Sequence, residues 1–176
     1  MATMTSEHAS VILHSVGLPS LKAEHPVTKA VIAAIPAEKS DFRPDAVTRS
    51  AMDLAWHIVT AENRFMEAVI DGVFDLAPRD RPAAVATPAD VNRWYEEQFN
   101  QNFERLSTVS GDRLVRAIDF RGIFQFPAVI YIQLALGHSI HHRGQLSMLL
   151  RPMGARVPSI YGESYDARVE RERKQA

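Results

Sequence analysis

The stretch His138–Leu150, HSIHHRGQLSMLL, carries three of the chain's seven histidines within five positions. Apolar residues recur through and around this stretch at the helical period, which predicts a buried helix. An α-helix advances about 100° per residue, so positions four apart lie on one face. His138 and His142 are such a pair, and they lie in the middle of the apolar stripe. We therefore expect both imidazoles to face the protein interior.

Four segments of the chain predict helices, and proline-rich connections separate them. Their approximate bounds are residues 21–35, 47–70, 88–110 and 127–151. The third has a clear start signal, because Thr87 suits an N-cap and Pro88 suits the first helical position. Residues 111–126 alternate loosely and predict an extended connection. Four helices with connections of intermediate length favour an all-α, four-helix-bundle fold, in which sites are built from side chains on facing helices.

Length and composition indicate one ordinary globular domain over residues 1–176, with flexible ends of about 10 residues at the N-terminus and about 8 at the C-terminus. The 20 Lys and Arg nearly balance the 21 Asp and Glu, which argues against a nucleic-acid partner. The start of the chain lacks the features of a signal peptide, and no apolar run is long enough to span a membrane. We expect a cytoplasmic protein.

The histidine pair has two readings, either hydrogen-bonded partly buried side chains or ligands of a metal ion. Because the chain has no cysteine, a metal site must use His, Asp or Glu. A third imidazole favours the metal, since His57 also lies on the apolar face of its helix and can meet the pair across the bundle. His141 lies on the same side as the pair, so the spacing alone does not exclude it as a ligand.

His57, the stretch HSIHHRGQLSMLLRPMG and the following VPSIYGESYD together resemble the DinB superfamily. These DinB/YfiT-like proteins are described as candidate metal-dependent enzymes of four-helix-bundle fold, and the resemblance covers nearly the whole chain. It implies a divalent metal, nickel or zinc, held by His57, His138 and His142, with His141 as an adjacent histidine that is not a ligand. It also implies a homodimer.

Some relatives act with a low-molecular-weight thiol, and some of those carry a glutamate where this chain has His138. No thiol-binding fingerprint is visible here, so a thiol cofactor rests on the resemblance alone.

Other residues receive supporting roles. Asp53 and Gln145, each one turn from a predicted ligand, and the neighbouring His141 are candidates for orienting the ligands. Arg143 and Arg151 are expected at the rim of the last helix. Three histidines are expected to play no part in the site, namely His8, His14 and His25.

Two functions follow from this pattern. The first is a metal-dependent hydrolase, or a thiol-dependent transferase, that acts on an unidentified small molecule. The second is a non-catalytic metal-binding helical dimer with a sensing or structural role.

Overall fold

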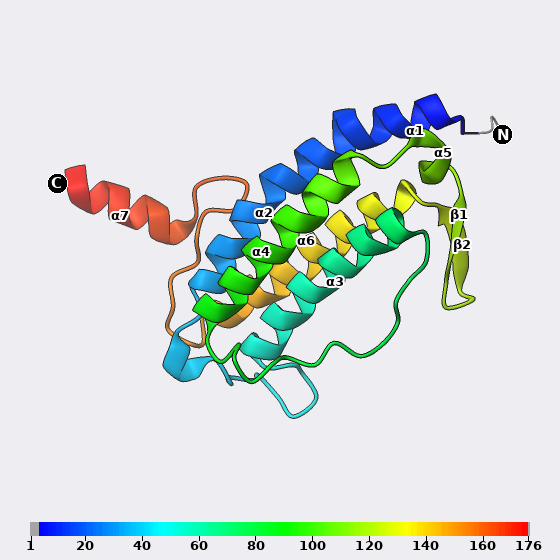
Figure 1. Cartoon of the computed structure of the whole chain (residues 1–176). Coiled ribbons are helices and arrows are strands. Elements are labelled where there is room, and N and C mark those ends of the chain that lie inside the picture. Colours follow the sequence, from blue (N-terminus) through cyan, green and yellow to red (C-terminus); the bar gives the residue numbers. More distant parts are fainter. Residues whose placement is uncertain (1–3, 176) are drawn as a thin grey trace.

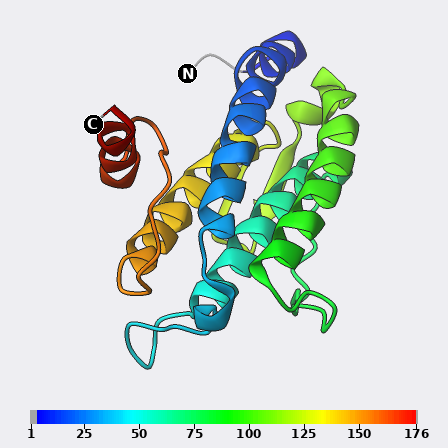
Figure 2. The same ribbon diagram turned by 90° about the vertical axis from the view of Figure 1, so that its left-hand side faces the viewer.

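The computed structural model describes residues 4–175, and it is mostly helical. Four long helices run side by side (Figures 1 and 2). They are α2 (Leu18–Ala33), α3 (Ala51–Asp71), α4 (Pro88–Ser107) and α6 (Ile130–Leu150). Helix α3 packs against α4 and α6, and α2 packs against the same two helices. The α3–α6 face therefore lies on the opposite side of the domain from the α2–α4 face.

Local sequence signals account for the ends of these helices. Thr87 accepts a hydrogen bond from the Asp90 backbone, the Asp90 side chain bonds back to the Thr87 backbone, and Pro88 follows the cap as predicted. Ser50 caps α3 in a similar way. Gly72 ends α3 with φ at +76°, a left-handed conformation that glycine adopts without steric strain.

Among residues 4–175, five shorter helical elements accompany the four long helices. They are α1 (Ser6–Ile12), a π-helical turn (Leu13–Gly17), a 3₁₀ turn (Ala37–Lys39), α5 (Gly111–Leu114) and α7 (Tyr165–Gln175). The π-helical turn joins α1 to α2, so helical structure starts well before the predicted position 21. Both segments that we expected to be flexible thus contain helix, while residues 1–3 and 176 lie outside the described part of the chain.

The extended connection predicted over residues 111–126 is confirmed only in part, because it begins with helix α5 and continues as an antiparallel hairpin of β1 (Ala117–Phe120) and β2 (Phe124–Pro127). Phe120 pairs with Phe124 across the turn. Within the turn Arg121 and Gly122 have φ values of +58° and +68°. The left-handed region is common for glycine but rare for arginine, so Arg121 is held in an unusual conformation.

The expectation that Arg143 lies at the rim of α6 is wrong, because this residue is buried in the core. Only 1% of its surface is exposed, and it contacts Glu24 Oε2 at 2.5 Å and Thr28 Oγ1 at 3.1 Å. It also donates to the hydroxyl oxygen of Tyr161 at 2.5 Å. Arg151 is half-exposed as expected and pairs with Asp166.

A stripe of small and apolar side chains explains the burial of Arg143. Leu136, Ser139, Leu146 and Leu150 are buried along the same side of α6 at helical spacing. Arg143 lies between them, so it turns inward with the stripe, and its charge is matched by Glu24.

Within the described residues, no helix is long and apolar enough to cross a membrane.

Candidate metal centre

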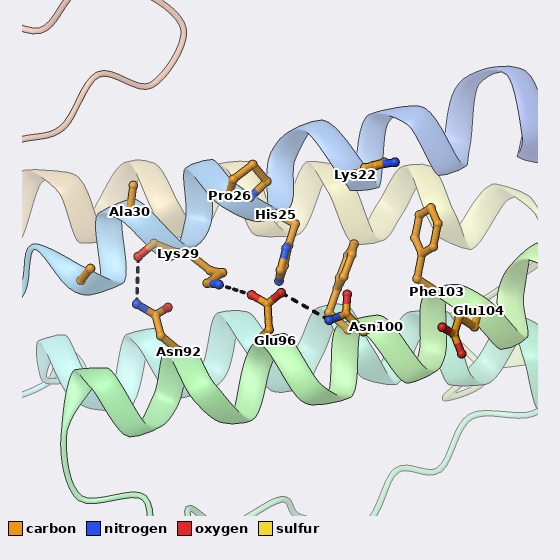
Figure 3. A pocket seen from close by; sticks show the side chains of 12 residues that line it. Lys22, His25, Pro26, Lys29, Ala30, Asn92, Glu96, Asn100, Phe103 and Glu104 are labelled. Carbon is orange, nitrogen blue, oxygen red and sulfur yellow. Dashed lines mark hydrogen bonds and ion pairs between the residues drawn. The ribbon is translucent and has the colours of Figure 1, made fainter.

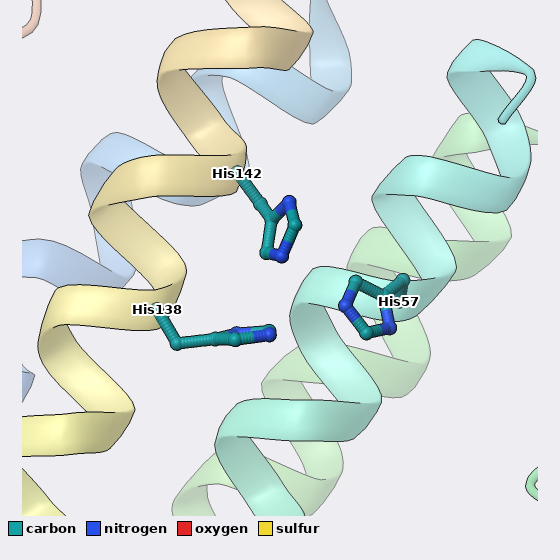
Figure 4. Close-up of side chains that lie close together, drawn as sticks. All are labelled: His57, His138 and His142. Carbon is teal, nitrogen blue, oxygen red and sulfur yellow. The ribbon is translucent and has the colours of Figure 1, made fainter. Parts of the chain in front are cut away.

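Three histidines converge between α3 and α6. His57 comes from α3, while His138 and His142 come from successive turns of α6 (Figure 4). One ring nitrogen of each lies within 4.8 Å of the others, and the ring centroids are 4.4 to 4.9 Å apart. We call these three residues the histidine cluster. A group with this spacing could hold a single metal ion.

The cluster is more accessible than the apolar stripe predicts. All three histidines are half-buried, so they lie at the edge of the α3–α6 contact and not in the core. The reason is that α6 buries the side that carries Arg143, which leaves the neighbouring side partly open to solvent. Partial exposure leaves room for a small molecule to approach the cluster.

Gln145 orients one member of the cluster. The Nδ1 atom of His142 lies 2.7 Å from Gln145 Oε1, which can only accept, so Nδ1 carries the proton. The Nε2 atom of His142 is then unprotonated and free to bind a cation. The Gln145 amide lies 3.2 Å from Nε2 of the exposed His141, which joins His141 to His142 through one side chain. Gln145 and His141 thus both lie next to the cluster, as expected for residues that could orient its members.

Asp53 does not contact the cluster. Its Oδ2 accepts a hydrogen bond from Arg43 at 3.0 Å, and its backbone amide bonds to the Ser50 cap. Among the described residues no hydrogen bond joins Asp53 to His57, so the orienting role expected for it is absent. The ion pair with Arg43, in the loop before α3, explains this, because it draws the Asp53 carboxylate away from His57.

The cluster histidines are in the protonation state that binds a metal ion. Burial, together with the charge of nearby groups such as Arg49, lowers the pKa of His57 and of His138 from 6.5 to about 4. Burial also lowers the pKa of His142. The imidazoles are therefore neutral near pH 7, which is the form that binds metal. Within residues 4–175 the buried Nδ1 of His138 has no hydrogen-bond partner, and a cation would satisfy an imidazole nitrogen of this kind.

These pKa values predict that the metal-free protein loses stability as the pH falls from about 6.5 towards 4. In that window the unfolded histidines take up protons that the folded ones do not, so acid favours unfolding. The measurement is the urea midpoint, with chelator present, at several pH values from 7.5 to 4.5. His57→Gln should show a shallower decline than the parent; parallel curves would contradict the lowered pKa of His57.

Two pockets reach the cluster from different sides. The hairpin pocket has a volume of about 230 Å³ and includes His57 and His138. Its remaining lining is Thr60, Ala61, Arg64, Phe65, Phe74, Leu76, Phe120 and Arg121. The loop pocket has a volume of about 720 Å³ and includes His142 and Gln145. Its remaining lining is Val47, Thr48, Arg49, Leu54, Met148 and Leu149.

A larger groove of about 870 Å³ lies elsewhere, between α2 and α4 (Figure 3). His25 borders it and stacks on Phe99 with ring centroids 3.9 Å apart, and burial lowers its pKa to about 4. The groove contains none of the cluster residues, so His25 lies outside the cluster, as expected. His8 and His14 also lie apart from the cluster, where His8 contributes to the α1 cap and His14 bonds to backbone carbonyls.

Sequence reasoning missed the arginines around the cluster. Arg49 ends the loop before α3, Arg64 lies on α3 and Arg121 lies in the hairpin turn. The charge of Arg49 contributes to the lowered pKa of all three cluster histidines, so it is near each of them. No local motif marks these positions, and only the folded chain brings them together.

Comparisons with known proteins give a consistent family match. Residues 12–174 match the DinB family. The chain is 26% identical over 130 residues to the protein YjoA of Bacillus subtilis, an alignment that covers 73% of this chain and 82% of YjoA. It is 31% identical over 110 residues to YrdA of the same organism, and this alignment covers 62% of the chain and 64%, just under two thirds, of YrdA.

Two crystal structures of DinB-like proteins share the fold. The structure of YjoA from Bacillus subtilis superposes with a TM-score of 0.67 at 21% identity, covering 82% of this chain and 96% of that one. A DinB-like protein from Bacillus cereus gives a TM-score of 0.71 at 23% identity, with coverages of 84% and 97%. At these identities the likeness establishes the fold and nothing beyond it.

Proposed function

This chain belongs to the DinB family, and we propose that its histidine cluster binds one divalent metal ion that serves as the centre of an enzyme active site. The observation that carries the proposal is the convergence of three imidazole nitrogens, from two helices, within 4.8 Å of one another. Nickel and zinc are the ions we propose, because imidazole suits both and the chain offers no thiolate.

The surroundings of the cluster support a catalytic role over a structural one. Structural zinc sites fill all four positions with protein ligands, whereas catalytic sites use three and leave a position open. Here three histidines come together, and the hairpin pocket and the loop pocket both reach them. A small molecule can therefore approach the same point from either side.

The protein residues have separable roles in this proposal. The cluster holds the ion, and Gln145 fixes the proton of His142 on Nδ1 so that Nε2 is available. The bound ion would supply Lewis acidity to a substrate heteroatom, as hydrolysis or thiol-dependent transfer requires. The four long helices, which we propose form the family's four-helix bundle, hold α3 and α6 at the separation that the cluster needs.

The proposed ion should stabilise the fold by mass action. At a metal concentration about 100 times the dissociation constant, binding adds about 2.7 kcal/mol, or roughly 5–10 °C in melting temperature for a domain of this size. The measurement combines elemental analysis of the purified protein with melting curves with and without chelator. We expect one ion per chain and a clear fall in melting temperature on chelation; identical curves and no bound metal would contradict the proposal.

Activity assays on metal-quantified protein then distinguish the reactions. One set of assays offers a low-molecular-weight thiol with electrophiles, and the other offers esters and amides without thiol. Turnover that depends on both thiol and metal indicates transfer, and turnover that depends on metal alone indicates hydrolysis. Stoichiometric metal with a filled, unreactive coordination shell would instead support a non-catalytic metal-binding protein.

A further inference from the structure

The two pockets beside the histidine cluster share an unusual charge composition. The hairpin pocket contains Arg64 and Arg121, and the loop pocket contains Arg49. Among the described residues, no aspartate or glutamate lines either pocket. The groove between α2 and α4 differs, because its lysines are accompanied by Glu96 and Glu104. The two pockets at the cluster therefore carry unbalanced positive charge, whereas the groove between α2 and α4 does not.

These arginines also lack carboxylate partners within residues 4–175. Several other arginines are paired, for example Arg79 with Glu67 and Arg105 with Asp71. In contrast, Arg64 donates to the backbone oxygen of Ala77, and its buried Nε has no partner in the described structure.

The guanidinium of Arg121 packs 5.7 Å from the ring centroid of Phe120 and forms no ion pair in the described part of the chain. A surface arginine beside a pocket that contains no acid is available to an anion from solution.

The backbone of the hairpin turn fixes the position of Arg121. Its φ of +58° is unfavourable for a residue with a side chain, yet Arg121 stands at the turn beside Gly122. Two consecutive left-handed residues are what a tight hairpin turn of this kind requires, and the Ile123 amide closes it on the Phe120 carbonyl. The turn places the base of this side chain at the wall of the hairpin pocket.

Aromatic rings form the rest of that wall. Phe74 contacts both Phe65 and Phe120, with ring centroids 5.5 and 4.9 Å apart. The pocket thus combines an apolar wall, two cationic side chains and two of the cluster histidines in about 230 Å³. Pockets that combine an apolar lining with a few polar groups bind small molecules whose polar end is fixed in one orientation.

We propose that the substrate of this site is a small carboxylate with an apolar body, whose negative group is held by Arg64 and Arg121 and whose body packs against Phe65, Phe74 and Phe120. Arg49 adds positive potential from the loop pocket and draws the anion towards the cluster. The inference rests on the metal site proposed above, since it names the substrate class for that same site.

The test uses phenylacetate, phenylacetamide and acetate as probes on the cobalt-loaded protein. Calorimetry gives the dissociation constants, and the visible absorption of bound cobalt reports whether each probe perturbs the site. We expect phenylacetate to bind about tenfold or more tightly than its uncharged amide, because a charge-assisted contact to arginine is lost. Acetate should also bind more weakly than phenylacetate, because it lacks the apolar body.

Arg121→Asn is the decisive variant, since asparagine tolerates the left-handed conformation of the turn. This substitution should raise the dissociation constant of phenylacetate about tenfold and leave that of phenylacetamide unchanged. Arg173→Asn, which removes the same charge from exposed α7, is the matched control and should change neither. Equal binding of acid and amide, or full phenylacetate affinity in Arg121→Asn, overturns the inference while the metal site stands. Failure of the parent protein to bind cobalt overturns both.

Discussion

Replacing His57 with alanine should leave the purified protein without stoichiometric metal, and His142→Ala should do the same. Each change removes one of three proposed ligands. Loss of a residue that merely orients a ligand commonly weakens metal binding by about 10–100-fold, so loss of a ligand should exceed about 100-fold. Elemental analysis and a competition titration against a chelator measure the effect. Gln145→Ala should fall between the parent and the ligand variants, because it only orients His142.

His141→Ala is the matched control for these variants. It removes an imidazole from the same turn of α6 but from outside the histidine cluster, and it should largely retain the metal. The metal-free variants should all melt close to the metal-free parent, which separates lost binding from lost folding. Equal metal loss from His57→Ala, His142→Ala and His141→Ala would show that the ligand assignment is wrong.

Replacing Arg143 with methionine should destabilise the protein by about 3–5 kcal/mol, because removing one partner of a buried ion pair leaves the other charge uncompensated. The affected partner is Glu24, and the hydroxyls of Thr28 and Tyr161 also lose a donor. Chemical denaturation measures the change, which corresponds to roughly 6–20 °C in melting temperature.

Arg151→Met provides the comparison on the same helix. Arg151 is half-exposed and pairs with Asp166 at the surface, where an ion pair contributes about 0–1 kcal/mol. The two substitutions are chemically identical, so a difference between their effects on the free energy of unfolding reports the effect of burial. If Arg143→Met does not fold at all, Tyr161→Phe still tests the network, with an expected loss of about 1–2 kcal/mol, because its hydroxyl accepts a hydrogen bond from Arg143 and donates one to Glu24. Equal small losses at positions 143 and 151 would contradict a buried role for Arg143.

Much of the helical framework could be predicted because its signals are local. The Thr87 cap, the proline after it and the glycine that ends α3 are each encoded within a few residues of the structure they specify. The pairing of His138 with His142 follows from helical spacing alone. The family resemblance then selected His57, His138 and His142, and the structure brings these three residues together.

The remainder depends on contacts between distant segments. Asp53 has the correct helical spacing to His57, yet its carboxylate bonds to Arg43 in the preceding loop. Arg143 is a charged residue, and its burial becomes favourable only because Glu24 approaches from α2. Arg121 lies near the cluster because of the conformation of the hairpin turn, which the hydrophobic periodicity of the sequence does not predict. The homodimer, the thiol cofactor and the cytoplasmic location stay predictions.

Arg143 directly follows His142, and this adjacency has a consequence for substitutions at position 143. One residue faces the proposed site and the next anchors the core, about 100° further around the same helix. A substitution that loosens the packing of Arg143 is therefore expected to shift the neighbouring imidazole as well. We expect changes at position 143 to alter both the stability of the fold and the geometry of the proposed site.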